Sequence, residues 1–205
     1  MIKEIYSFDL YEEFIKDYAN DSIYADPHFA FDNGNLYNSL SKNNRKAYIV
    51  SEGETVSGLF VWMILPDEKY IEMLIGLSNE ESSIQEMLTF IENEYKGYQL
   101  DFVVNPQHNL FCNLLQSKNA MFEEEQQWMV TYCYEKNEPY DIWVDNEFRD
   151  RGYEQALLQA AINMNKPKEM MVLVDINNFD EIETFKSVGF VPVIGTNSVY
   201  ATYKS

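Results

Sequence analysis

The feature that most constrains the fold of this chain is a regular alternation of strand-type and helix-type patterns. Apolar residues recur at helical spacing in three segments, at residues 10–18, 84–91 and 110–115. Runs typical of β-strands lie between and after these segments, at residues 47–51, 56–65, 70–75, 99–104 and 127–134. Helices and strands mixed in this way pack as layers around a common core. We therefore predict an α/β fold of the mixed α+β kind, with helices flanking a sheet.

A polar stretch that ends at Pro139 divides this alternation into two parts. We place the domain boundary there, with a first unit at residues 1–135 and a second, partial unit at residues 136–205. The elements expected in the second unit are a strand at 140–144, a helix around 157–162, a strand at 170–174 and a helix at 180–188. Gly189 is expected to terminate that last helix.

The order of elements in the second unit repeats part of the first. In both units a helix, a strand, a second helix and a final pair of strands follow one another. Thr131-Tyr132 and Thr202-Tyr203 lie 71 positions apart, as do Phe102 and Leu173 in the preceding strands. We interpret this order as a diverged structural repeat. The final strands of the second unit flank Gly195, and we expect them to form a hairpin.

The charge balance excludes whole classes of partner. The chain carries 34 Asp and Glu against 15 Lys and Arg, which gives a formal net charge of −19. Such a charge repels phosphate backbones and anionic lipids, so we expect no nucleic-acid partner and no membrane partner.

The residues that mark cell compartment and metal binding are sparse. Only two cysteines, Cys112 and Cys133, and two histidines, His28 and His108, occur, and none has a ligand-like spacing. No signal peptide is visible at the N-terminus. We therefore expect free thiols, no metal site and a cytoplasmic location.

The segment with most chemical content runs from Val144 to Leu158, from the end of a predicted strand into a predicted helix. It holds Arg149 and Arg151, two of the three arginines in the chain, directly before Gly152. A helix start presents backbone N–H groups and the positive end of a dipole, which suits a phosphate. The alternative is that both arginines pair with neighbouring carboxylates on a solvated face.

This segment resembles the GNAT superfamily of acyl-CoA-dependent N-acyltransferases. The acyl-CoA motif of that family is Gln or Arg, two residues, Gly, one residue, then Gly or Ala, and Arg149 and Gly152 match it. A second family element follows, in which a strand leads to Asn178 and then to a helix that closes at Gly189-Phe190. Residues 1–135 resemble the family in element order only, and lack the motif at residues 76–83.

The resemblance implies a GNAT-like fold with a pseudo-repeated second half, and acetyl-CoA or another acyl-CoA as co-substrate. In the family, two central strands splay apart and the pantetheine arm lies in the gap, here along the backbone near Ile142 and Val144. The resemblance places the pyrophosphate on the N–H groups of residues 151–154. The implied cofactor-binding residues are therefore Ile142, Val144, Arg149, Arg151, Gly152, Tyr153, Glu154 and Asn178.

The implied reaction is direct attack of an amine on the thioester, with a small molecule or a peptide as the acceptor. Phe185 stands where many family members place the tyrosine that protonates the departing thiolate. Tyr200 or Tyr203 could take over that role, and the alternative is that both pack across strands. Glu154 and Glu181 also depart from the family pattern. They leave open a second interpretation, a catalytically degenerate, acidic module for protein interaction or regulation.

Three further expectations concern packing. The strand at residues 140–144 would leave an unpaired edge, so we expect it to join the sheet of the first unit, or that of a second copy in a homodimer. Residues 26–29 and 31–34 form a turn-rich, aromatic loop where a family member has its substrate-gating helices, or else a packed surface loop. Residues 105–108 follow a strand and could cap the next helix.

Overall fold

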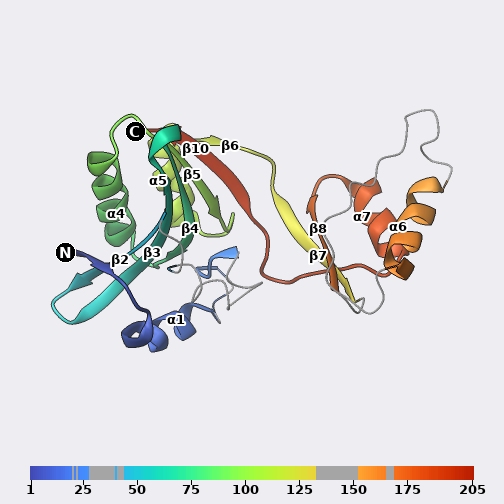
Figure 1. Cartoon of the computed structure of the whole chain (residues 1–205), viewed down its shortest axis with the longest axis horizontal. Coiled ribbons are helices and arrows are strands. Elements are labelled where there is room, and N and C mark those ends of the chain that lie inside the picture. The colour runs from blue at the N-terminus through green and yellow to red at the C-terminus, as the bar shows by residue number, and fades with distance from the viewer. Residues whose placement is uncertain (20, 22, 28–39, 41–43, 133–151, 165–168) are drawn as a thin grey trace. The chain divides into compact units, whose positions relative to one another are not determined.

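The computed structural model describes residues 1–19, 21, 23–27, 40, 44–132, 152–164 and 169–205. The chain forms two compact units (Figure 1). Unit 1 comprises Met1–Glu124 together with Gly195–Ser205, and unit 2 comprises Glu125–Ile194.

Unit 1 is built on a seven-stranded sheet with the order β1-β2-β3-β4-β5-β10-β6. Its strands are β1 (Ile2–Ile5), β2 (Arg45–Glu52), β3 (Thr55–Leu65), β4 (Tyr70–Leu77), β5 (Gln99–Val104), β6 (Met121–Phe122) and β10 (Val199–Lys204). All neighbouring strands are antiparallel except β4 and β5, which are parallel. A parallel pair needs a crossover, and α4 (Glu81–Glu94) supplies it.

Helices cover both faces of this sheet. On one face lie α4 and α5 (Asn109–Ser117) (Figure 1). They pack against a core of large aromatic and aliphatic side chains, in which Trp62 and Phe102 are fully buried. On the other face η1 (Asp9–Tyr11) and α1 (Glu12–Ala19) cover a second cluster that includes Ile15 and Leu59. A short 3-10 helix, η2 (Pro66–Glu68), joins β3 to β4.

The two parallel strands of unit 1 separate part of the way along their length. Their ladder runs only from Tyr70↔Gln99 to Met73↔Phe102. Directly after Met73 the register between β3 and β4 shifts, and Leu74 is left without a ladder partner. A bulge of this kind bends a strand and increases its twist. Beyond Met73, β4 therefore diverges from β5 and leaves an opening in the sheet.

Unit 2 holds a three-stranded sheet with the order β8-β7-β9. Its strands are β7 (Gln126–Tyr132), β8 (Glu169–Asp175) and β9 (Val191–Pro192), and its helices are α6 (Tyr153–Met164) and α7 (Phe179–Ser187). The described core is small, with Ile162, Val174 and Phe190 buried against one another.

The fold class is the one predicted, a mixed sheet flanked by helices, but the units do not follow a single cut after residue 135. The last strand, β10, lies between β5 and β6 of unit 1, and β7 pairs with β8 and β9 of unit 2. The predicted hairpin around Gly195 is therefore wrong, because its two strands belong to different sheets. An alternating pattern identifies a strand but leaves its partner open.

The predicted fused sheet is likewise not what the described strands form, since they make two separate sheets. Unit 2 includes β7 in its sheet, a strand from the predicted first unit of residues 1–135. Residues 140–144, on which that prediction depended, lie outside the described residues.

Candidate functional site

The predicted phosphate-binding turn of unit 2 begins at Gly152. This glycine has a φ of +81°, and a Cβ added to it would meet no atom of the described residues within 4 Å. Its carbonyl accepts the N–H of Ala156 at 3.1 Å, so helix α6 begins here. A glycine at such a position takes the left-handed conformation without strain, and the N–H groups of the helical turn that follows have no acceptor within the helix. Of the other predicted residues, Ile142, Val144, Arg149 and Arg151 lie outside the described residues.

Tyr153 and Glu154 form the first turn of α6. The side chain of Tyr153 is half exposed, at 50%, and Glu154 is partly buried. The carboxylate of Glu154 suits the positive end of the helix dipole, and it would compete there with a bound anion. The turn thus offers backbone donors together with one carboxylate that disfavours a second negative charge.

Asn178 occupies the N-cap of α7 and uses both ends of its amide inside the protein. Its Oδ1 accepts the N–H of Glu181 at 3.3 Å, and its Nδ2 donates to the Glu181 carboxylate at 2.9 Å. Burial raises the pKa of Glu181, and the hydrogen bond from Asn178 opposes that rise. Asn178 therefore caps α7 through Oδ1, while its Nδ2 binds the side chain of the N3 residue, Glu181.

The two tyrosines predicted as acids both lie on β10 in unit 1. Tyr203 is buried, stacks on Phe102 with ring centroids 5.6 Å apart, and donates its hydroxyl to Glu92 at 2.9 Å. Burial raises the pKa of Tyr203 and also that of Tyr200, which is partly buried. Unit 1 therefore holds both predicted acids and unit 2 holds Gly152, so no single unit brings them together.

The turn between β5 and α5 in unit 1 matches the turn between β8 and α7 in unit 2. The carbonyl of Asn105 accepts the N–H of His108 at 2.9 Å, and 70 positions later the carbonyl of Asp175 accepts the N–H of Asn178 at 3.0 Å. His108 caps its helix through Nδ1, which accepts the N–H of Phe111 at 3.3 Å. The predicted helix cap at residues 105–108 is thus confirmed, and the shared frame supports a repeat with a spacing of 70 rather than 71.

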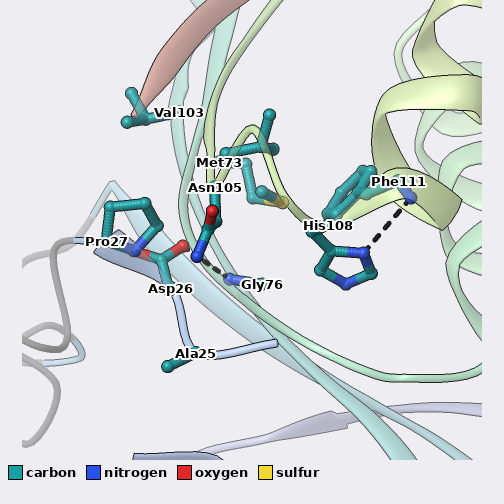
Figure 2. Close-up of a pocket in the computed structure, with 10 residues that line it drawn as sticks. Ala25, Asp26, Pro27, Met73, Gly76, Val103, Asn105, His108 and Phe111 are labelled. Atoms are coloured by element: carbon teal, nitrogen blue, oxygen red, sulfur yellow. Dashed lines mark hydrogen bonds between the residues drawn. The ribbon is translucent and has the colours of Figure 1, made fainter. Parts of the chain in front are cut away.

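Figure 2 shows the pocket at the opening between β4 and β5. Its lining residues are Ala25, Asp26, Pro27, Met73, Gly76, Val103, Val104, Asn105, His108 and Phe111. The carboxylate of Asp26 accepts the N–H of Gly76 at 3.1 Å, and Asp26 is only 3% exposed. Within the predicted loop at residues 26–29, Asp26 and Pro27 are therefore buried in unit 1 rather than packed at its surface.

His108 lies on the opposite side of the same opening. Its Nδ1 is an acceptor, so Nε2 carries the hydrogen and donates it to the carbonyl of Ser78 at 2.8 Å. Burial lowers the pKa of His108, which keeps the ring neutral. The sequence identified His108 only as a cap. Nothing in the pattern indicated that Asp26 and His108 both bind backbone groups at the end of β4, at Gly76 and Ser78.

Metal and membrane sites do not emerge from the described residues. Within those ranges no three or more His, Cys, Asp or Glu side chains gather closely enough to hold a metal ion. None of the described helices combines the length and apolar composition needed to span a bilayer.

Comparison with known proteins identifies the fold. No protein-family model matches the chain, and no curated protein sequence matches it either. A solved tandem GNAT protein from the clavulanic acid biosynthesis pathway aligns over 100% of this chain and 98% of its own, with a TM-score of 0.54 and 9% identity. A candidate acetyltransferase from Thermoplasma acidophilum aligns over 100% of both chains, with a TM-score of 0.55 and 10% identity.

A GCN5-related N-acetyltransferase from Sphaerobacter thermophilus aligns over 77% of this chain and 80% of its own, with a TM-score of 0.51 and 8% identity. At these identities the likeness establishes the fold alone. The chain has the fold of the GNAT acetyltransferases, as the sequence resemblance implied.

Proposed function

We propose that this protein is an acyl-CoA-dependent N-acyltransferase that binds acetyl-CoA, or another acyl-CoA, at the start of α6 in unit 2. One observation carries the proposal. On a GNAT fold, the glycine of the predicted motif has a left-handed φ, has open space beside it and begins a helix of 12 residues. That arrangement suits a diphosphate, which accepts hydrogen bonds from several backbone N–H groups at once.

The binding residues follow from the motif. In this proposal the N–H groups of residues 151–154 and the guanidinium groups of Arg149 and Arg151 hold the pyrophosphate. The backbone near Ile142 and Val144 holds the pantetheine arm, and Asn178 is a further proposed cofactor-binding residue. The acceptor is a small-molecule or peptide amine, which the negative charge of the chain attracts as an ammonium ion.

The reaction is an acyl transfer in which the amine nitrogen attacks the thioester carbon. A C–N bond forms, the C–S bond breaks, and one proton passes from the amine to the leaving thiolate. The protein contributes chiefly by holding the two reactants in line and by polarising the carbonyl with a backbone N–H. Tyr200 and Tyr203 are the proposed proton donors. Their raised pKa values keep them protonated at neutral pH, although Tyr203 already donates its hydroxyl to Glu92.

Isothermal titration with acetyl-CoA tests the binding step. We expect a dissociation constant in the micromolar range, about −8 kcal/mol of binding free energy. Gly152→Trp should weaken binding by at least about 100-fold, because the indole fills the space in front of the helical N–H groups.

Gly97→Trp is the matched control for that substitution. Gly97 has a φ of +80°, no atom lies within 4 Å of an added Cβ, and it belongs to unit 1. We expect its affinity for acetyl-CoA to equal that of the wild type. The absence of heat at millimolar acetyl-CoA would reject the proposal. If acetyl-CoA binds, release of CoA in the presence of a panel of amines would distinguish a working transferase from a non-catalytic binding module.

A further inference from the structure

The polar backbone groups at the opening in unit 1 all need partners. Strands that separate lose their ladder bonds, and buried N–H and C=O groups are costly when left unpaired. β4 continues for four residues beyond Met73, the last residue that it pairs with β5. An acyl-CoA arm in such a gap would bind to these exposed groups, as proposed above for unit 2.

Side chains of unit 1 already occupy these groups. Asp26 accepts the N–H of Gly76 at 3.1 Å, and His108 donates to the carbonyl of Ser78 at 2.8 Å.

The loop that leads to α4 is closed in the same way. The hydroxyl of Tyr18 accepts the N–H of Asn79 at 2.9 Å, and the hydroxyl of Ser78 accepts the N–H of Glu80 at 3.1 Å. Four backbone groups between Gly76 and Glu80 are thus engaged by the protein's own side chains.

The space that remains is too small for a ligand. The cavity lined by Asp26 and His108 measures about 10 Å³, roughly the volume in which one water molecule fits. Asp26 and His108 are each 3% exposed, so they lie inside unit 1. Gly76 is closely packed too, because an added Cβ would lie 2.7 Å from the sulfur of Met73. At Gly152, by contrast, an added Cβ would meet no described atom within 4 Å.

We infer that Asp26, His108 and Tyr18 form an internal plug of the β4–β5 opening. Unit 1 therefore binds no acyl-CoA, and each chain binds a single acyl-CoA in unit 2. The stoichiometry rests on the proposed function, whereas the plug itself rests only on the contacts within unit 1.

Amide hydrogen exchange by nuclear magnetic resonance tests the plug without any ligand. In the wild type the amides of Gly76 and Asn79 should be protected. Asp26→Ala should speed exchange at Gly76 by about tenfold, whereas Asp26→Asn, which keeps an acceptor oxygen, should not. If Asp26→Ala does not fold, Tyr18→Phe provides the second variant, with about tenfold faster exchange expected at Asn79. Unprotected Gly76 and Asn79 amides in the wild type would overturn the plug.

A titration of the full chain with acetyl-CoA, followed by amide shifts, tests the stoichiometry. We expect one equivalent to shift amides at residues 152–156 and to leave Gly76, Asn79 and Glu80 unmoved. Shifts at Gly76 to Glu80 in the wild type would overturn the inference. If acetyl-CoA shifts no amide resonance at all, the proposed function is rejected instead. The slow exchange at Gly76 and its loss in Asp26→Ala would in that case still support the plug.

Discussion

The turns at the end of β5 and at the end of β8 have the same backbone hydrogen bonds but different capping side chains. Three residues separate the end of β5 from the capping residue His108, and two separate the end of β8 from Asn178; a nine-residue helix follows each cap. The Asn178 amide turns back to Glu181 on its own helix, 2.9 Å away. The longer His108 ring caps its helix with one nitrogen and reaches the carbonyl of Ser78 on the β4 side with the other.

The difference shows how one residue can decide whether a turn is self-contained or tied to a neighbouring strand. Asn178 bonds to groups close to it in sequence, at Asp175 and Glu181. A histidine has two nitrogens on opposite sides of a rigid ring, and it joins two segments 30 residues apart in sequence. The cap in unit 1 therefore closes the opening that unit 1 would otherwise present.

The largest effect on stability is expected from substitutions in the hydrophobic cores of the two units. Phe190→Ala removes one of the three buried residues that form the described core of unit 2. We expect a loss of about 3–5 kcal/mol in unfolding free energy, which leaves unit 2 unfolded. Phe102→Ala removes a similar area from the larger core of unit 1, and we expect that unit to remain folded. Amide hydrogen exchange, measured separately for the amides of each unit, tests both variants. Protected amides in unit 2 of Phe190→Ala would contradict the prediction.

Exchanging the caps is expected to have the next largest effect. His108→Asn gives unit 1 the cap that unit 2 uses, so α5 keeps its N-cap. The carbonyl of Ser78 loses its donor, and we expect a loss of about 1–3 kcal/mol in unfolding free energy at pH 8. Asn178→Ala should cost about 1 kcal/mol, the value of an ordinary cap. Equal losses in chemical denaturation would show that the bond to Ser78 adds no stability.

The pH dependence of stability should also follow His108. Burial lowers the pKa of His108 in the folded protein below its ordinary value of 6.5, so the unfolded chain binds the proton more tightly. Stability from the neutral ring is therefore fully present above pH 6.5 and is lost as the pH falls from 6.5 toward the lowered folded value. Chemical denaturation at pH 8 and pH 5.5 measures the unfolding free energy, and its decrease between the two pH values should be smaller in His108→Asn than in the wild type. An equal decrease in the two proteins would show that the pH dependence of stability comes from groups other than His108.

The smallest expected effect lies at the ends of the two helices. Asn119 and Gly189, 70 positions apart, both have a positive φ, of 58° and 99°. Ala at either position should cost about 1 kcal/mol, because a Cβ is strained in this conformation. Asn119→Gly should change the unfolding free energy by only a few tenths of a kcal/mol, about the measurement error. A large loss in Asn119→Gly would indicate that the asparagine side chain has a role of its own.

The sequence predicted local elements well because their signals are local. The strand expected at 56–65 is Thr55–Leu65, the one expected at 99–104 is Gln99–Val104, and the helix expected at 180–188 is Phe179–Ser187. Gly189, the predicted terminator of that helix, follows it with a positive φ of 99°. Periodicity and glycine placement report on residues close in sequence, which is why these boundaries agree within one residue.

Strand partners and the plug could not be predicted in the same way. β10 pairs with β5 across about a hundred positions, and a sequence pattern does not record which edge a strand will join. The bond between Asp26 and Gly76 spans 50 positions. It depends on the bulge that separates β4 from β5, and the alternation of apolar residues carries no sign of that bulge.

The place of β10 in unit 1 has a consequence for how this protein is made. Synthesis delivers β1 to β6 first, yet the position between β5 and β6 is filled only by residues 199–204. Until the ribosome has produced them, Phe102 lacks the Tyr203 ring that stacks on it, and one edge of β5 stays bare. The unit translated first is thus the last to be finished, and the emerging chain must keep that edge from pairing elsewhere in the meantime.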